Sequence, residues 1–270
     1  MNQLKVDVVL LTKNSLKPCL QECVDSIYRN IPVSTLIVVD GGSTDGTREL
    51  LQKYPNVKII DDTSGTRATA RQKGIEATET SWHVQVDSDV ILCSDWFTQA
   101  WKKIEDNVGA VWGAALPNDK HFFNMSYAMS KLYRISVKDL MVKQMRSERC
   151  MMHDTLIKTS LVKGIKIPAG LHIWEDDYIG KYIIKQCYRF LKVSDPYCLH
   201  NVTPNERFEG YVTAGYLMKK CRIGSFKQVV RWICLAIPKA VWIFIVTRDI
   251  QAAKIQFLSS VLTFKGWLAA

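Results

Sequence analysis

Two aspartates one residue apart, Asp87 and Asp89, follow a short segment (83–86) that contains no Asp, Glu, Lys or Arg. Both carboxylates can turn toward a ligand that binds at the end of a strand. Carboxylate oxygens are the hard ligands that Mg²⁺ and Mn²⁺ prefer, including where the ion holds a diphosphate. The pair therefore indicates a divalent metal site, and a solvated turn or a cap for a helix beginning after Asp95 is the alternative.

A run of three carboxylates, Glu175, Asp176 and Asp177, precedes a segment with helical spacing. The helix dipole favours acidic side chains in a first turn, so helix capping is one interpretation of the run. Three adjacent negative charges also repel one another, which raises at least one pKa and suits a general base. His200 follows an expected strand over 193–199 and is a candidate metal ligand, although a lone histidine is more often structural.

Two further groups could meet a nucleotide. Asp40 opens a Gly-rich loop (40–47) that lacks the lysine and the spacing of a P-loop and is not a dinucleotide fingerprint. Its carboxylate can accept hydrogen bonds from a base or ribose, or it can simply hold the turn. Arg71 lies four residues after Arg67 on one face of an expected helix, where it can contact a phosphate or remain solvated.

These side chains follow a repeated order of strand, loop and helix. Apolar runs predict strands at 6–11, 36–39, 57–60 and 83–86, and helical spacing predicts helices at 16–27, 47–54 and 67–77. That order predicts an α/β fold with a mostly parallel sheet and helices on both faces. Ligands bind at the C-terminal ends of strands in such sheets, which is where Thr12, Asp40 and Asp87 fall.

Six blocks, taken in order along the chain, resemble a family 2 glycosyltransferase of GT-A fold. They are Val8–Asn14, Leu36–Thr47, Ala70–Gly74, Val86–Asp89, Glu175–Asp177 and His200. The resemblance covers residues 5–205, and its most specific parts are the second block and the Asp-x-Asp that follows it.

The resemblance implies an inverting enzyme that takes a sugar from a nucleoside-diphosphate sugar, with UDP expected before GDP. It assigns the nucleotide-sugar site to Thr12, Asn14, Asp40, Arg71, Asp87 and Ser88. It assigns Asp89 and His200 to a divalent metal, Mn²⁺ or Mg²⁺. It implies that Asp176 is the catalytic base, with Glu175 and Asp177 as alternates.

The formal net charge of +10 is unevenly distributed along the chain. It amounts to −4 over residues 1–119, +7 over 120–166, −1 over 167–210 and +8 over 211–270. An acidic half beside two basic blocks argues against nucleic acid as a partner and favours an anionic surface or ligand. We expect a catalytic domain over 1–210 and a basic, apolar, amphipathic helical region over 211–270.

The C-terminal region is strongly apolar over 229–247, but Arg231, a proline and Lys239 interrupt it. A spanning helix needs about 20 apolar residues, and a charge at its centre costs about 3 kcal/mol. We therefore expect helices that lie in the interface of a membrane with anionic lipids, with Arg231, Trp232 and Trp242 at the boundary. A soluble helical cap and a membrane hairpin are the alternatives.

The acceptor side is expected in the Met-rich and aromatic segment that contains Lys131 and Arg134, unless that segment is only a packed helix. Eight scattered cysteines and the absence of a leader pattern predict a cytoplasmic protein, peripheral on the inner face of the cell membrane. A lipid-linked acceptor, such as a polyprenyl phosphate or a lipid-carried glycan, fits that location. The alternatives are a soluble or surface polysaccharide acceptor and an inactive GT-A binding module. Four intact acids argue against the inactive module: Asp40, Asp87, Asp89 and Asp176.

Overall fold

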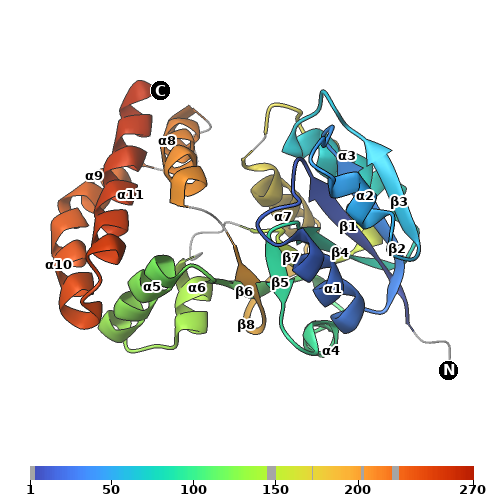
Figure 1. Cartoon of the computed structure of the whole chain (residues 1–270), viewed down its shortest axis with the longest axis horizontal. Helices are drawn as coiled ribbons and strands as arrows, with labels where there is room; N and C mark the ends of the chain where they lie inside the picture. Colours follow the sequence, from blue (N-terminus) through green and yellow to red (C-terminus); the bar gives the residue numbers. More distant parts are fainter. Residues whose placement is uncertain (1–3, 145–149, 172, 202–203, 221–224) are drawn as a thin grey trace. The chain divides into compact units, whose positions relative to one another are not determined.

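The computed structural model describes residues 4–144, 150–171, 173–201, 204–220 and 225–270, which form two compact units (Figure 1). The first unit comprises Met1–Leu116 and Met141–His200, and the second comprises Pro117–Leu140 and Asn201–Ala270. The second unit thus begins before the expected boundary at residue 210 and includes an earlier segment. That segment joins it because its helix packs against the C-terminal helices.

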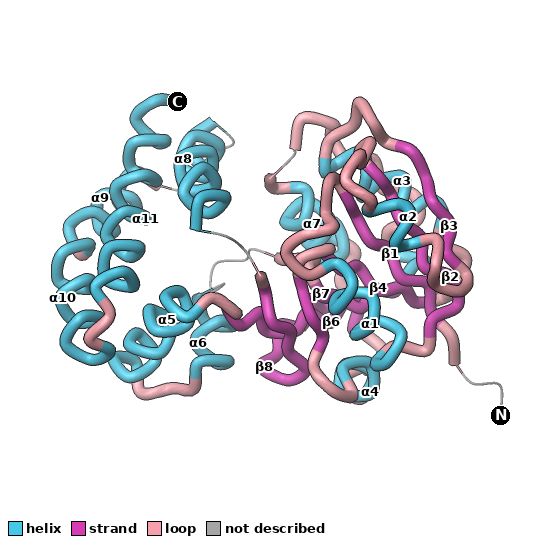
Figure 2. Tube along the Cα trace, in the orientation of Figure 1, coloured by secondary structure: helices cyan, strands magenta, loops and turns pink. Residues whose placement is uncertain are grey.

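The first unit holds an eight-stranded sheet in the order β3-β2-β1-β4-β7-β6-β8-β5 (Figure 2). The strands are β1 (Val6–Thr12), β2 (Val33–Asp40), β3 (Val57–Asp61), β4 (Trp82–Asp87), β5 (Val90–Leu92), β6 (Val108–Pro117), β7 (Asp154–Lys158) and β8 (Arg189–His200). The four strands predicted from apolar runs form the parallel part, β3-β2-β1-β4. The pairs β4–β7, β6–β7 and β5–β8 are antiparallel, an addition that the sequence pattern did not predict.

Helices cover both faces of this sheet, which confirms the predicted α/β class. They are α1 (Leu20–Asn30), α2 (Thr47–Leu51), α3 (Arg67–Ala77), α4 (Trp96–Trp101) and α7 (Glu175–Lys185), with a short 3-10 turn, η1 (Thr159–Leu161). One apolar cluster joins α1 and α4 to the side chains of Val8 and Leu10, and a second joins α3 and α7 to Ala110 and Ile157. Apolar residues at both i and i+1 along the strands make this two-sided packing possible.

Helix α1 begins four residues after its predicted start because the chain before it is committed to loop contacts. The backbone N–H of Ser15 donates to Thr47 Oγ1 at 2.9 Å, and that of Leu16 donates to Asp45 Oδ2 at 3.0 Å. These bonds tie the loop after β1 to the loop after β2. Residues 13–19 therefore belong to the loops at the C-terminal edge of the parallel strands, where a nucleotide is expected, and α1 begins only after them.

The second unit is helical. Its elements are α5 (Lys120–Tyr133), α8 (Pro204–Lys220), α9 (Phe226–Cys234), α10 (Ala236–Thr247) and α11 (Ile250–Ala269), and α6 (Val137–Gln144) begins in this unit. Helices α8 and α11 pack backbone to backbone, because a Cβ on Gly215 or Gly266 would clash with a carbonyl oxygen of the facing helix. Of the described helices, none is by itself long and apolar enough to cross a membrane. Only α9 and α10 taken together, bent by 44° at their junction, reach that length and composition.

Asp249 ties α11 to α5 inside the second unit. Its carboxylate accepts hydrogen bonds from the backbone N–H groups of Gln251 and Ala252, from Asn124 Nδ2 at 2.9 Å, and lies 2.8 Å from His121 Nδ1. Burial opposes ionisation, but these hydrogen bonds outweigh it and lower the pKa of Asp249 to about 2. An ionised helix cap therefore joins two segments that are far apart in the sequence.

Candidate active site

The first part of the site is the junction of β1 and β2, where Thr12 pairs in register with Asp40. Asp40 is fully buried and accepts hydrogen bonds from Thr12 Oγ1 at 2.9 Å and from both the N–H (2.9 Å) and the hydroxyl (2.5 Å) of Ser43. Burial alone would raise the pKa of Asp40, but these hydrogen bonds lower it. The ionised carboxylate of Asp40 thus holds the turn of its own loop, which was one of the two roles that the sequence allowed. Direct contact of Asp40 with a base stays a prediction.

Asn14 and Ser88 connect the loops that follow three neighbouring strands. Asn14 has a left-handed backbone conformation (φ 50°), which asparagine tolerates well, and its Oδ1 accepts the backbone N–H of Thr44 at 2.9 Å. The hydroxyl of Ser88, after β4, donates to the hydroxyl of Ser15, after β1, at 3.0 Å. Both residues therefore lie where the resemblance expects the nucleotide, at the C-terminal ends of parallel strands.

Arg71 is buried and bound rather than solvated. From α3 its guanidinium reaches Asp87 at the end of β4, at 2.5 Å, and Gln85 Oε1 at 2.9 Å. Burial would raise the pKa of Asp87, but Arg71 and, after it, His153 lower it. The alternative of a solvated helix face applies to Arg67, which is exposed, and is excluded for Arg71.

Asp89 and His200 come together although 111 positions separate them. Strands β5 and β8 pair antiparallel with Val90 opposite His200, which brings His200 Nε2 to 3.2 Å from Asp89 Oδ2. The side chain of Asp89 is 31% exposed and that of His200 is 18% exposed, so both can reach a metal ion from solvent. One carboxylate oxygen and one imidazole nitrogen, with an open side, fit a divalent ion that keeps positions for phosphate oxygens.

His153 is a site residue that the sequence analysis missed. It lies directly before β7, its backbone carbonyl accepts the N–H of Asp87 at 3.1 Å, and its buried ring lies 5.4 Å from the ring of His200. Burial alone would lower the pKa of His153, but the hydrogen bond and the charge of Asp154 raise it. An adjacent His-Asp pair at the head of an apolar run, Leu156-Ile157, was the signal that could have identified it.

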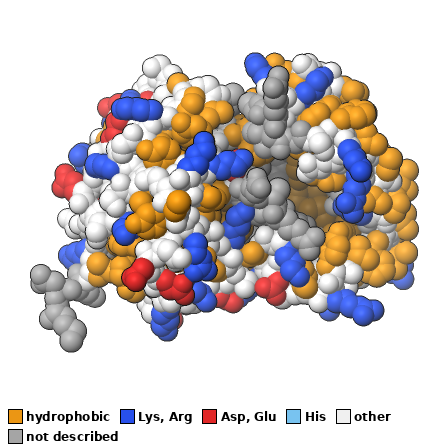
Figure 3. All heavy atoms as spheres, turned by 180° about the vertical axis from the view of Figure 1, so that it is seen from behind, with side chains coloured by type: hydrophobic (Ala, Val, Ile, Leu, Met, Phe, Trp, Pro, Cys, Tyr) orange, Lys and Arg blue, Asp and Glu red, His pale blue; other side chains and the backbone are white. Residues whose placement is uncertain are grey.

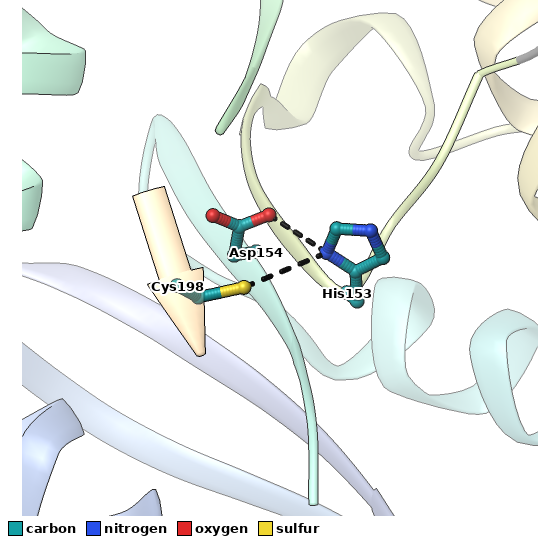
Figure 4. A group of neighbouring side chains, drawn as sticks. All are labelled: His153, Asp154 and Cys198. Carbon is teal, nitrogen blue, oxygen red and sulfur yellow. Dashed lines mark hydrogen bonds and ion pairs between the residues drawn. The ribbon is translucent and has the colours of Figure 1, made fainter. Parts of the chain in front are cut away.

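Within the described ranges, His153, Asp154 and Cys198 form a cluster of possible metal ligands whose atoms lie within 4.8 Å of one another (Figure 4). Asp154 Oδ1 lies 2.8 Å, and Cys198 Sγ 3.9 Å, from the same ring nitrogen of His153. The second oxygen of Asp154 accepts the indole N–H of Trp96 at 3.0 Å. Hydrogen bonds therefore already occupy the donor atoms that a metal would need, and we interpret the cluster as a buried support behind Asp89 and His200.

The three acids of α7 have different surroundings. Asp177 accepts the backbone N–H of Cys150 at 3.1 Å and pairs with Lys181 at 2.7 Å, so it holds the helix in place. Asp176 is buried, and its Oδ1 accepts the N–H of Asp177 at 2.7 Å. Glu175 Oε2 is buried without a hydrogen-bond partner among the described residues. Burial first, and the charge of Asp176 second, raise the pKa of Glu175 to about 7. The direction agrees with the prediction from the run of acids, but repulsion between neighbouring charges is the smaller of the two causes.

Glu175→Gln is expected to make the chain more stable at pH 8, by about 1–3 kcal/mol, and to leave stability at pH 4.5 nearly unchanged. The folded state holds a proton on Glu175 between about pH 4.5 and 7 that the unfolded state has lost. Stability contributed by this residue therefore falls as pH rises through that window. Urea unfolding at the two pH values measures the effect, and an equal change in the exposed control Glu49→Gln would contradict it.

The remaining predicted residues belong to the second unit. Lys131 and Arg134 are exposed near the end of α5, with Lys131 Nζ 5.0 Å from the ring of Tyr127. Trp242 Nε1 donates to the carbonyl of Ala128 at 2.8 Å, which gives it a packing role between α10 and α5. Arg231 and Trp232 line a cavity on α9. The positions of Arg231, Trp232 and Trp242 at a membrane boundary stay predictions.

Two solved structures have the same fold as this chain. The chain superposes on a mannosyltransferase, PcManGT from Pyrobaculum calidifontis in complex with GDP-Man and Mn²⁺, with a TM-score of 0.65 and 17% identity over 98% of this chain and 86% of that one. It superposes on residues 1–349 of S. aureus TarS with a TM-score of 0.57 and 16% identity over 97% and 90% of the two chains. Both likenesses show the GT-A fold.

Sequence comparison identifies the family. The chain is 25% identical over 104 residues to the uncharacterized glycosyltransferase EpsJ of Bacillus subtilis (strain 168), a match that covers 37% of this chain and only 30% of that relative. Residues 7–161, more than half of the chain, match the glycosyl transferase family 2. The chain is therefore a member of glycosyl transferase family 2, with the GT-A fold.

Proposed function

We propose that the chain transfers a sugar, with inversion, from a UDP- or GDP-sugar to a lipid-linked acceptor at the cytoplasmic face of a membrane. The observation that carries the transfer chemistry is that one unit holds the Arg71–Asp87 pair, the Asp89–His200 pair and the buried acids Glu175 and Asp176. Helix α7, which carries the two acids, packs against α3, which carries Arg71. Solved relatives in complex with GDP-Man or UDP-GlcNAc support a nucleotide-sugar donor.

Asp89 and His200 are proposed to hold Mn²⁺ or Mg²⁺. The mixed oxygen and nitrogen donor pair favours Mn²⁺, because Mg²⁺ is usually held by oxygen atoms alone. A Mn²⁺ complex of the mannosyltransferase supports this choice. When bound, such an ion supplies positive charge that stabilises the departing diphosphate.

The protein's own side chains supply the rest of the proposed mechanism. Arg71 fixes the carboxylate of Asp87 at the strand end, where it can accept a hydrogen bond from the ribose. Asp176 takes the proton from an acceptor hydroxyl, or orients an acceptor phosphate that is already ionised. Attack in line with the leaving diphosphate then inverts the anomeric carbon.

The proposed membrane location rests on an exposed apolar stripe along α10, formed by Ile237, Val241 and Ile245. These side chains are 63%, 52% and 53% exposed, and their spacing of four residues places them on one helix face. Phe226, the first residue of α9, is also exposed (58%). Figure 3 shows a broad exposed hydrophobic area over the C-terminal helices, with Lys and Arg side chains beside it. Apolar and basic surfaces on one helix are typical of binding in a membrane interface. A soluble cap is the competing interpretation.

Incubation with labelled donors tests the acceptor class. Wild-type protein with UDP- or GDP-sugars and a membrane extract is expected to give a labelled product that partitions into organic solvent. A labelled soluble glycan, with no labelled lipid, would instead favour the polysaccharide acceptor. No labelled product with either acceptor would reject the transferase assignment of this site.

Replacing the stripe with the triple variant Ile237→Ser, Val241→Ser and Ile245→Ser is expected to lower flotation with anionic vesicles at least tenfold. Each side chain is more than half exposed, so the loss of apolar contact with lipid exceeds the loss of packing inside the unit. Substitution is preferable to truncation, because removal of the C-terminal helices would uncover α5. Equal flotation of the variant and the wild type would contradict the membrane proposal.

A further inference from the structure

A cavity in the second unit has no role in the proposed sugar transfer. It has a volume of about 460 Å³ and lies beside α9, where α9 leads into α10. Gln228, Arg231, Leu235 and Lys239 line it, at spacings of three or four residues that keep them on one side of the helix pair. Trp232, next to Arg231, and Tyr133, at the end of α5, also line it. All of these residues belong to one unit, so the cavity is defined within it.

The charge of this cavity is uncompensated. Lys227, Arg231 and Lys239 line it, and none of the described residues that line it carries a carboxylate. Over the part of the chain that the structure describes, none of the three forms an ion pair, and Asp249, which is the only acid in 211–270, is committed to His121. Lys239 is half-buried, and burial first and Arg231 second lower its pKa. A bound anion would relieve this unfavourable arrangement of cations.

Neutral hydrogen-bond donors accompany the cations. Tyr133 offers a hydroxyl, Gln228 an amide and Trp232 an indole N–H. Among the described residues, the side chains of these three form no hydrogen bond within the protein, so their donors remain available to a ligand. A phosphate group, with several acceptor oxygens around one dianionic centre, matches these donors and cations. Arg231 can also bind two phosphate oxygens at once through its planar guanidinium.

We propose that the cavity formed by Tyr133, Lys227, Arg231, Trp232 and Lys239 binds a phosphate group, with a lipid phosphate as its source. Phosphate recognition follows from the charges and donors of the cavity. The lipid source rests on the proposed membrane function, because the apolar stripe of Ile237, Val241 and Ile245 belongs to the same pair of helices. The lipid phosphate would hold the chain at the membrane independently of the donor site.

Fluorine NMR of the full chain labelled with 5-fluorotryptophan tests this proposal, because Trp232 lines the cavity. The Trp232 resonance is assigned as the one lost in Trp232→Phe. The titrants are soluble dihexanoyl phosphatidic acid, which carries a phosphomonoester, inorganic phosphate, and dihexanoyl phosphatidylcholine as the zwitterionic control. Phosphatidic acid is expected to shift the resonance saturably, and phosphatidylcholine is not.

The variant Arg231→Gln with Lys239→Met is expected to weaken phosphatidic acid binding more than tenfold, since each basic group near an anionic lipid contributes about fivefold. The matched control, Lys254→Met with Lys265→Met, removes the same charge from exposed positions of α11 and should change affinity less than twofold. Unchanged resonances of the other tryptophans show that each variant is folded.

The outcomes distinguish a lipid phosphate from a soluble phosphate, and the phosphate site from the proposed sugar transfer. Equal binding of inorganic phosphate and phosphatidic acid would overturn the lipid source and leave a site for soluble phosphate. No saturable shift with either, or equal losses in both double variants, would overturn the site itself. UDP-sugar and GDP-sugar binding to the same wild-type sample is followed by thermal shift. A missing donor response beside an intact Trp232 response therefore defeats the transferase proposal alone.

Discussion

Asp176→Asn is expected to lower the rate of transfer to a hydroxyl acceptor by about 10²–10⁴-fold, with little change in donor affinity. The substitution keeps the size of the buried side chain and removes its ability to take a proton. Donor contacts are expected from Asp87 and Arg71, which the change does not touch. Initial rates with saturating donor, beside donor binding by calorimetry, measure the two effects separately.

Asp177→Asn is the matched control for that variant. The Asp177 carboxylate binds Lys181 and the N–H of Cys150, so its loss should reduce stability and leave the chemical step largely intact. A phosphate acceptor needs no proton transfer, and with it the effect of Asp176→Asn should shrink to about tenfold. Equal rates for wild type and Asp176→Asn with every acceptor would remove Asp176 from the mechanism.

Arg71→Met is expected to destabilise the first unit by about 2–4 kcal/mol and to abolish measurable donor binding. The change leaves Gln85 buried without its partner and Asp87 without its counter-charge. The Asp87 side chain is 35% exposed, so water partly compensates, and the expected loss is below that of a fully buried pair. Thermal unfolding and donor calorimetry measure the two consequences.

The double variant Arg71→Met with Asp87→Asn separates stability from function. Removing the carboxylate charge as well should recover part of the lost stability, because no unpaired charge then remains. Donor binding should stay lost, because Asp87 is proposed to contact the ribose. If Arg71→Met alone unfolded at the same temperature as the wild type, the Arg71–Asp87 ion pair would contribute little to stability.

The parallel half of the fold was predictable because each of its strands carries several apolar β-branched or leucine residues and is followed by polar loop residues. Buried runs such as Leu36–Val39 mark strands that helices cover on both faces, and the acids that follow them mark the ligand-binding edge. The order of these blocks was sufficient to predict the family and the positions of Asp40, Asp87 and Asp89 at strand ends.

Long-range contacts account for what the sequence could not predict. The partner of Asp89 is selected by the β5–β8 register, and the support from His153 depends on β7 packing between β4 and β6. Arg71 could be placed on a helix face, but only the fold shows that Asp87 neutralises it. Likewise, the sequence led us to expect Trp242 at a membrane boundary, and it did not indicate that the Trp242 indole N–H would donate to the carbonyl of Ala128 in α5.

The most direct measurement is a thermal-shift screen of UDP- and GDP-sugars, with and without Mn²⁺, on the wild type and on Asp89→Ala. At least one donor is expected to stabilise the wild type by several degrees when Mn²⁺ is present, because a ligand that binds only the native state raises its stability. Asp89→Ala should lose most of that shift, since it removes the accessible carboxylate that faces His200. A wild type that no donor stabilises, or an equal shift in Asp89→Ala, would contradict a metal-assisted nucleotide-sugar site at this edge of the sheet.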